Sequence, residues 1–257
     1  MLTGSSPSPE ETEEVVGGWS LSIYPEVLEA AGTYRVGGTR GGAVYVGPGD
    51  AVDPERTMRI AAGRAASKLK RYVVANRLNR LGTLTYAGEG CHDPVALRRD
   101  VGEFFRRLRA ALGGDPFPYA WVPEWHPGGH GLHVHFTVGR FVPRTMIAGT
   151  WGRGFVHIKL LSDLPVGTSA FHEAYMAAGY LAKYVSKAFG EDRVLGLHRY
   201  EVAQGFQPKV VRVIALYLDD LIEEARKVIG ARPTEVLHSD EWPMWSGPKA
   251  VVMRWSP

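Results

Sequence analysis

Residues 131–138, with the sequence GLHVHFTV, alternate strictly between apolar and polar side chains, and this pattern constrains the fold more than any other stretch. A period of two predicts a β-strand whose two faces differ. One face is apolar and packs on a core, while the other carries His133, His135 and Thr137. Two imidazoles on one strand face, two residues apart, can reach a single metal ion. The stretch therefore predicts a sheet with a core side and a site side.

A second strand is predicted directly before the histidine strand, over Tyr119–Trp125. Only a short turn around residues 127–129 separates the two strands, and so short a connection requires antiparallel neighbours. Helical patterns among the strands place the chain in the α+β class, with a central, largely antiparallel sheet of about five strands flanked by helices. Further strands are expected at 19–24, 82–86, 155–160 and 250–255, and helices at 54–78, 93–112, 145–151, 169–189 and 210–229.

Composition restricts the class of protein. The 257 residues, 45% of them hydrophobic and 22% charged, can bury a full core and are typical of a soluble globular protein. The net charge of +3 does not by itself indicate a nucleic-acid partner. A single cysteine, Cys91, excludes an internal disulfide and a thiolate zinc cluster, and fits a reducing cytoplasm. No signal peptide and no membrane span are expected, because the chain has neither a basic-then-apolar leader nor an apolar run of ~20 residues.

The sequence also suggests a division of the chain. Residues 1–16 are rich in Ser, Pro and Glu and are expected to form a disordered acidic tail. Residues 17–55 are expected to form an N-terminal extension, in which the β-like pieces Thr33–Val36 and Ala43–Val46 are compatible with a β-hairpin. Residues 56–257 are expected to form the domain that carries the site. Residues 34–46 are rich in glycine, but they lack the Gly-Lys-Ser/Thr ending of a Walker motif, so no nucleotide cofactor is expected.

A third metal ligand is predicted on the strand beside the histidines. The hairpin brings Glu124 next to the face that carries His133 and His135, and two imidazoles with one carboxylate form a common open coordination set. His126 and His130 are alternatives for the third position. Residues 136–138 do not continue the histidine pair as metallo-hydrolases do, and Arg140 stands where cupins need glutamate. Imidazoles suit manganese, zinc or cobalt better than magnesium, so the donor set alone does not select the ion.

A helix over residues 177–189 presents tyrosines and lysines on one side. At about 100° per residue, its apolar positions form one stripe, and the opposite side carries Tyr180, Lys183, Tyr184 and Lys187. The two tyrosines are one turn apart, so their hydroxyls can reach the same point. A nearby cation favours the phenolate and can also bind a phosphate. The other interpretation of this pattern is a solvated helix face with an incidental mixture of tyrosine and lysine.

Together, these motifs resemble the HUH endonuclease superfamily of replication initiators and nickases. Its three motifs occur in order as Thr83–Tyr86, His133–His135 and Tyr180–Lys187. The third resembles the paired-tyrosine form found in rolling-circle replication initiators (Rep proteins) of single-stranded DNA phages. Relaxases place the tyrosine before the histidines, so the order argues against them. The resemblance covers about Leu81–Lys187 and implies a Rep-like domain in the bacterial cytoplasm.

The resemblance implies a mechanism. Tyr184 would attack a phosphate of single-stranded or hairpin origin DNA, release a 3′-OH and remain joined to the 5′-phosphate, and Tyr180 would serve the second transfer. Lys183 and Lys187 would position the phosphate or stabilise the phenolate. Mg²⁺ or Mn²⁺ would be held by the ligands predicted above, namely His133, His135 and Glu124. Because the chain has no helicase motif, a host helicase acting in trans is expected.

Basic and aromatic side chains are candidates for DNA contacts. Two helices carry clustered cations, of which Arg64, Lys68, Arg71, Arg106 and Arg107 are predicted to bind the DNA backbone. A solvated helix face explains any single arginine equally well. The aromatic residues Trp121, Trp125, Trp151 and Phe155 are candidates for stacking on unpaired bases, although core packing is the better explanation for most of them.

Three other interpretations remain open. A transposase of the same superfamily would use the same chemistry on the ends of a mobile element. An inactive DNA-binding module would keep the fold, but the intact histidine, tyrosine and lysine set argues against it. A zinc hydrolase with a His₂Glu site would make the tyrosine helix accidental, and tightly bound zinc without DNA affinity would favour it.

Overall fold

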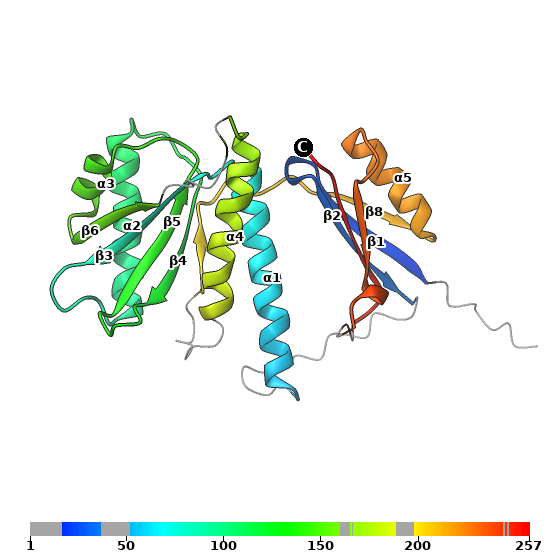
Figure 1. The fold of residues 1–257 in the computed structure, drawn as a ribbon, viewed down its shortest axis with the longest axis horizontal. Helices are drawn as coiled ribbons and strands as arrows, with labels where there is room; N and C mark the ends of the chain where they lie inside the picture. The colour runs from blue at the N-terminus through cyan, green and yellow to red at the C-terminus, as the bar shows by residue number, and fades with distance from the viewer. Residues whose placement is uncertain are drawn as a thin grey trace, which may run out of the picture. The chain divides into compact units, whose positions relative to one another are not determined.

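The computed structural model describes residues 17–36, 52–159, 165, 167–188, 198–243, 245 and 247–257. Within these residues it contains two five-stranded antiparallel sheets and five α-helices, which confirms the α+β class (Figure 1). The chain divides into two compact units, one formed by Met1–Tyr45 with Val210–Pro257 and the other by Val46–Lys209. The expected tail at 1–16 lies outside the described residues, as does the second half of the expected hairpin.

The sheet of the second unit has the strand order β6-β3-β5-β4-β7. Its histidine strand, β5, pairs with β3 on one side and with β4 on the other, in antiparallel register throughout. The turn between β4 and β5 closes with a hydrogen bond from the His126 amide to the Gly131 carbonyl, 2.8 Å long. The strands are β3 (Arg80–Tyr86), β4 (Tyr119–Trp125), β5 (Leu132–Val138), β6 (Gly154–Lys159) and β7 (Glu201–Val202).

Helices α2 (Pro94–Ala111) and α3 (Arg144–Trp151) pack on the apolar face of this sheet. The Asp93 side chain accepts a hydrogen bond from the Val95 amide at 2.8 Å, and proline follows at the first position, so α2 begins where the sequence predicts. Its buried stripe contacts the apolar side chains of β5, for example Phe104 against Phe136. This packing fixes the apolar face of β5 inward, and the alternation of the strand then directs the histidines to the other face.

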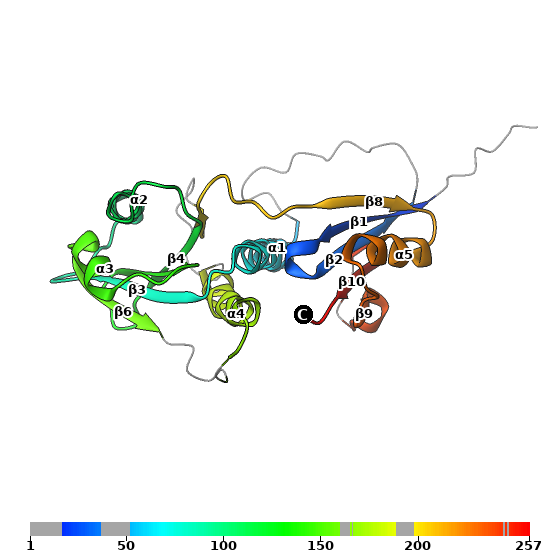
Figure 2. The same ribbon diagram turned by 90° about the horizontal axis from the view of Figure 1, so that it is seen from above.

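Helix α4 (Ala170–Ala188) packs on the opposite face, over β4 and β5, and α1 (Pro54–Ala75) packs beside α4 (Figure 2). The buried side of α4 includes three alanines, at 174, 177 and 178, whose small side chains let a neighbouring helix approach closely. The Tyr72 hydroxyl of α1 donates to the Ala203 carbonyl at 3.0 Å, which ties α1 to the segment that follows β7. These contacts hold α4, with its tyrosines, on the histidine face of the sheet.

The first unit is a separate sheet with the order β8-β1-β2-β10-β9, packed on α5 (Leu218–Ile229). Its segments precede and follow the second unit in the sequence. Its core contains Leu21, Ile23, Leu221 and Val251. The strands are β1 (Gly18–Tyr24), β2 (Glu29–Arg35), β8 (Val211–Ala215), β9 (Glu235–His238) and β10 (Ala250–Arg254). None of the helices in the described part of the chain is both long and apolar enough to cross a membrane.

The helix predicted over residues 210–229 is wrong in its first part. Val211–Ala215 forms β8, which pairs with β1 so that Val213 lies opposite Leu21. The alternating valines favour a strand once a partner is available, and that partner lies almost 200 residues earlier in the chain. The helix begins only at Leu218, where two aspartates in the first turn favour an N-terminus.

Candidate functional site

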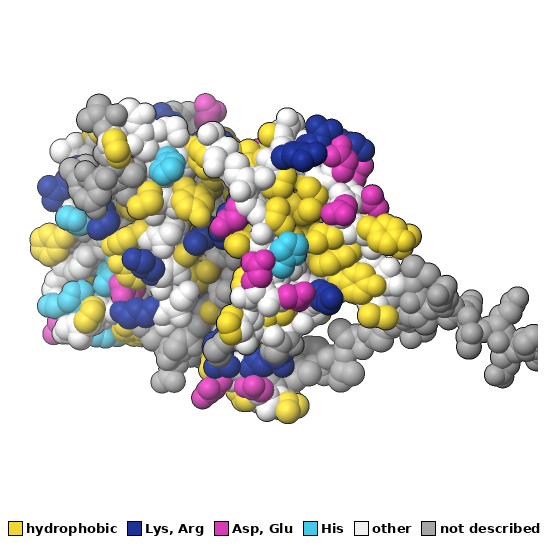
Figure 3. Space-filling model, turned by 45° about the vertical axis from the view of Figure 1, so that its right-hand side comes forward, with side chains coloured by type: hydrophobic (Ala, Val, Ile, Leu, Met, Phe, Trp, Pro, Cys, Tyr) yellow, Lys and Arg dark blue, Asp and Glu magenta, His cyan; other side chains and the backbone are white. Residues whose placement is uncertain are grey.

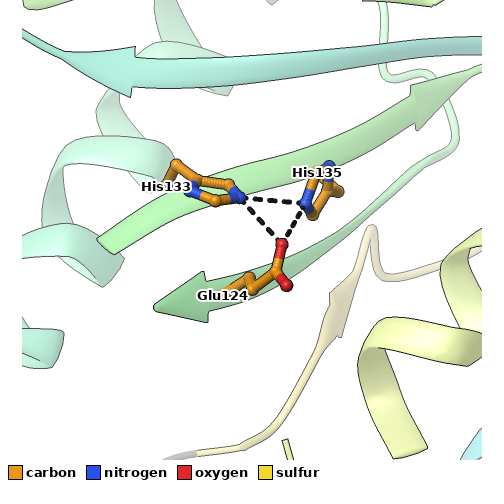
Figure 4. Close-up of side chains that lie close together, drawn as sticks. All are labelled: Glu124, His133 and His135. Atoms are coloured by element: carbon orange, nitrogen blue, oxygen red, sulfur yellow. Dashed lines mark hydrogen bonds and ion pairs between the residues drawn. The ribbon is translucent and has the colours of Figure 1, made fainter. Parts of the chain in front are cut away.

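Glu124, His133 and His135 converge on one point (Figure 4). Glu124 lies directly opposite His133 in the pairing of β4 with β5, so its carboxylate shares a face with both histidines. The Nε2 atoms of His133 and His135 are 3.1 Å apart, and each is within 2.9 Å of Oε2 of Glu124. His126 and His130, the alternatives for the third position, are exposed and lie outside this group. The structure therefore brings together the three residues that the sequence favoured.

The three donor atoms fit a single cation. Two ligands at a right angle around an ion with bonds of about 2.1 Å lie about 3.0 Å apart, whereas a tetrahedral arrangement separates them by about 3.4 Å. The observed separations of 2.8–3.1 Å match the right-angled arrangement. All three side chains are at most 11% exposed, so few water molecules compete with a bound ion. The group can therefore hold a divalent ion.

Thr83 of β3 supports this cluster. Its hydroxyl oxygen is 3.1 Å from Nδ1 of His135, because Thr83 and His135 are directly opposite in the pairing of β3 with β5. A partner on Nδ1 fixes the ring orientation and leaves Nε2 toward the shared point, as is typical around metal-binding histidines. By contrast, Nδ1 of His133 is buried and has no hydrogen-bond partner among the described residues. Thr83 thus orients the His135 ring, and the sequence marked it only as part of the first motif.

Burial and hydrogen bonding set the charges of the cluster. Burial lowers the pKa of His133, and it lowers the pKa of His135 to about 4, so both imidazoles are neutral near pH 7. Burial alone would raise the pKa of Glu124, but hydrogen bonds from Lys187, His135 and His133 outweigh it and lower that pKa to about 2. Neutral imidazoles and an ionised carboxylate are the forms that bind a metal.

The stability of the metal-free protein is expected to fall between pH 6.5 and 4. The pKa of His135 is about 4 in the folded protein and about 6.5 in the unfolded chain. Between these values the unfolded chain binds more protons, so the free energy of unfolding decreases as the pH falls. Urea denaturation in EDTA at pH 6.5, 5.5 and 4.5 measures this slope. The variant His135→Gln should have a slope shallower by up to about 1.4 kcal/mol per pH unit, and equal slopes would contradict the assignment.

Helix α4 places both tyrosines against the histidine face. The Tyr184 ring stacks on His135 with centroids 3.8 Å apart and an interplanar angle of 20°, and the Tyr180 ring lies edge-on at 6.0 Å. The Tyr184 hydroxyl donates to the Tyr180 hydroxyl at 2.7 Å. Burial and this hydrogen bond raise the pKa of Tyr184, so its phenol keeps its proton at neutral pH unless a cation approaches. The two tyrosines are one helical turn apart, and their hydroxyls are therefore in contact beside the cluster.

The lysines near the tyrosines differ in their positions. Lys187 forms an ion pair with Oε1 of Glu124, on the carboxylate oxygen that does not contact the histidines. Lys183 is exposed on the same helix. Lys159, at the end of β6, places its ammonium group 4.7 Å from the centre of the Tyr180 ring. No local pattern in the sequence selects Lys159, because only the strand pairing brings it to the tyrosines.

The predicted DNA-binding cations lie on two different sides of the sheet. Arg64 and Lys68 are exposed on α1, where Arg71 is half-buried. Arg106 and Arg107 are exposed on α2, which covers the face opposite the cluster, and Arg107 pairs with Glu103. The unit Val46–Lys209 holds 22 Lys and Arg against 14 Asp and Glu, a net charge of +8, while the rest of the chain is net acidic. Figure 3 shows the cations on the visible face of the molecule in several separate groups among acidic and hydrophobic side chains.

Comparison with known protein families gives a match that covers the site. Residues 79–189 match the model of a family described as replication-associated protein ORF2. This range runs from the start of β3 to the end of α4, and therefore includes Thr83, the Glu–His–His cluster and the tyrosine pair. The strands of the first unit lie outside it. No curated protein and no solved structure matches the chain.

Proposed function

We propose that this protein is a single-stranded DNA nickase and ligase that initiates rolling-circle replication of a plasmid, phage or integrative element. The observation that carries this proposal is the contact of Tyr184 with His135, which puts a nucleophilic hydroxyl beside a group able to hold a divalent ion. The match of residues 79–189 to a replication-associated family supports a role in replication.

In the proposed reaction, the phenol oxygen of Tyr184 attacks phosphorus and the bond from phosphorus to the 3′-oxygen breaks. The products are a 5′-phosphotyrosine and a free 3′-OH, which takes up a proton as the phenol loses one. The Tyr180 oxygen accepts a hydrogen bond from the Tyr184 hydroxyl, which holds that hydroxyl in place beside the cluster. The exchange conserves one phosphodiester bond, so rejoining needs no nucleotide cofactor. The work of the protein is positioning and charge stabilisation.

A Mg²⁺ or Mn²⁺ ion held by Glu124, His133 and His135 would polarise a phosphate oxygen and stabilise the charge that develops on it. Lys187 forms an ion pair with Oε1 of Glu124, so its ammonium group lies where it can also contact the phosphate. Lys183 is one turn away and exposed, which suits a backbone phosphate of the incoming strand. Tyr180 is adjacent to the same cluster and would carry out the second transfer that closes the circle.

The first experiment asks whether a covalent bond forms. The full chain is incubated with Mn²⁺ and labelled single-stranded DNA from its own replicon, and the products are separated under denaturing conditions. We expect a labelled protein band that depends on the metal, together with a shorter strand ending in a 3′-OH. Double-stranded DNA of the same sequence serves as the control and should give little adduct. Hydrolysis without any protein-linked strand would contradict the proposal.

A further inference from the structure

Edge strand β6 continues the candidate site across the sheet. Phe155 lies opposite Thr85 of β3, Thr85 lies opposite His133 of β5, and His133 lies opposite Glu124 of β4. Directly paired residues of antiparallel strands share a face, so these four side chains form one row on the site face. Neighbouring strands are about 4.8 Å apart, so Phe155 is roughly 10 Å from His133, a span of very few nucleotides. The next rows along β6 carry His157 beside Thr83 and Lys159 beside Leu81.

Among the described residues, nothing covers this part of the site face. Helix α4 packs over β4 and β5, and the side chains of β6 on the same face are exposed. Phe155 is 70% exposed, and His157 and Lys159 are also exposed. An aromatic side chain with that much exposure contributes little to the core. Lys159 connects this open area to the tyrosines, because its ammonium group lies over the Tyr180 ring.

The structure also separates Phe155 from the other aromatic candidates. Trp121 and Trp151 are at most 4% exposed and pack in the core, which leaves no free ring face for a base. Trp125 is 37% exposed, but it follows Glu124 on the strand and therefore points to the other face of the sheet. Among these four candidates, Phe155 alone is exposed on the face that carries the histidines.

We propose that Phe155, His157 and Lys159 form a platform that binds unpaired nucleotides of the DNA strand next to the scissile phosphate. Phe155 stacks on a base, and Lys159 contacts a backbone phosphate between that base and the tyrosines. Alternate residues of a strand are about 6.6 Å apart, so the three side chains can follow a strand along β6. The ligand is single-stranded DNA, because stacking on a side chain requires a base that is free of its partner. The net charge of +8 on this unit is complementary to the DNA backbone.

This inference rests on the proposed function for the chemistry at the tyrosines, but its test measures binding alone. The binding of a fluorescent 20-nucleotide oligo(dT) to the full chain is followed by anisotropy at fixed salt and in EDTA. We expect Phe155→Ala to weaken binding about tenfold, because each stacked base adds roughly that much affinity, and Phe155→Trp to retain it. Lys159→Met should reduce the salt dependence of binding by about one phosphate contact.

Phe141→Ala is the matched control, because Phe141 is 75% exposed and lies in the loop after β5 rather than on the site face. It should bind as the unaltered protein does. Equal binding by Phe155→Ala and the unaltered protein, or equal losses in the Phe155→Ala and Phe141→Ala variants, would overturn the platform. Either result combined with normal phosphotyrosine formation would leave the nickase proposal intact. Failure of the unaltered protein to form any adduct would instead count against the nickase proposal.

Discussion

Replacing both Tyr180 and Tyr184 with phenylalanine is expected to abolish the covalent protein–DNA adduct. The two hydroxyls are 2.7 Å apart and lie beside the same histidine, so removing only one leaves a second hydroxyl next to the cluster. The double variant loses both nucleophiles but keeps the rings, the helix and the cluster. Adduct formation with Mn²⁺ should fall by more than about a thousandfold, as is typical when a nucleophile is removed.

The single variants separate the two roles. Tyr184→Phe should lose most of the first cleavage, because Tyr184 is the ring stacked on His135. Tyr180→Phe should form the first adduct but fail to release a closed product, because the second nucleophile is missing. Anisotropy with oligo(dT) provides the control, since all three variants should still bind DNA. An adduct formed by the double variant would show that another residue is the nucleophile.

Local patterns predicted the site strands because each pattern has one structural solution. Strict alternation in Leu132–Val138 allows only a two-faced strand, and Asp93 followed by proline starts α2 where expected. The short turn forces β4 beside β5, which makes Glu124 a neighbour of His133 without further information. Spacing by one turn likewise places Tyr180 beside Tyr184. These predictions succeeded because each depends on residues close together in the sequence.

Features that depend on distant segments were not predictable in the same way. The strand partner of Val211–Ala215 lies far away in the sequence. Without that partner, the segment was predicted as part of the amphipathic helix that follows it. The position of Lys159 over Tyr180 depends on the pairing of β6 with β3 and on the docking of α4. The arginines of α2 were grouped with the site by charge alone, and only the packing of α2 shows that they lie on the other face. A cluster of charged residues does not indicate on which face of the sheet its helix packs.

Removing the Glu124 carboxylate is expected to eliminate metal-dependent cleavage. Glu124 is the acidic member of the Glu–His–His group, and one of its carboxylate oxygens contacts both imidazoles. Glu124→Ala should therefore weaken Mn²⁺ binding in calorimetry and reduce the cleavage rate by at least roughly a hundredfold. His135→Ala should behave in the same way, whereas excess Mn²⁺ should not restore either variant.

The matched controls are His126→Ala and His130→Ala, which remove the two histidines that the sequence offered as alternative ligands. His126 is close to the cluster, with its ring centre 5.5 Å from that of His133, but it is exposed and its Nδ1 accepts a hydrogen bond from the Gly128 amide. Both controls should keep Mn²⁺ affinity and cleavage within about twofold of the unaltered protein, because surface substitutions away from the ligands change little. If His126→Ala loses the metal while Glu124→Ala keeps it, the carboxylate serves only to orient the histidines, and the third ligand comes from the turn.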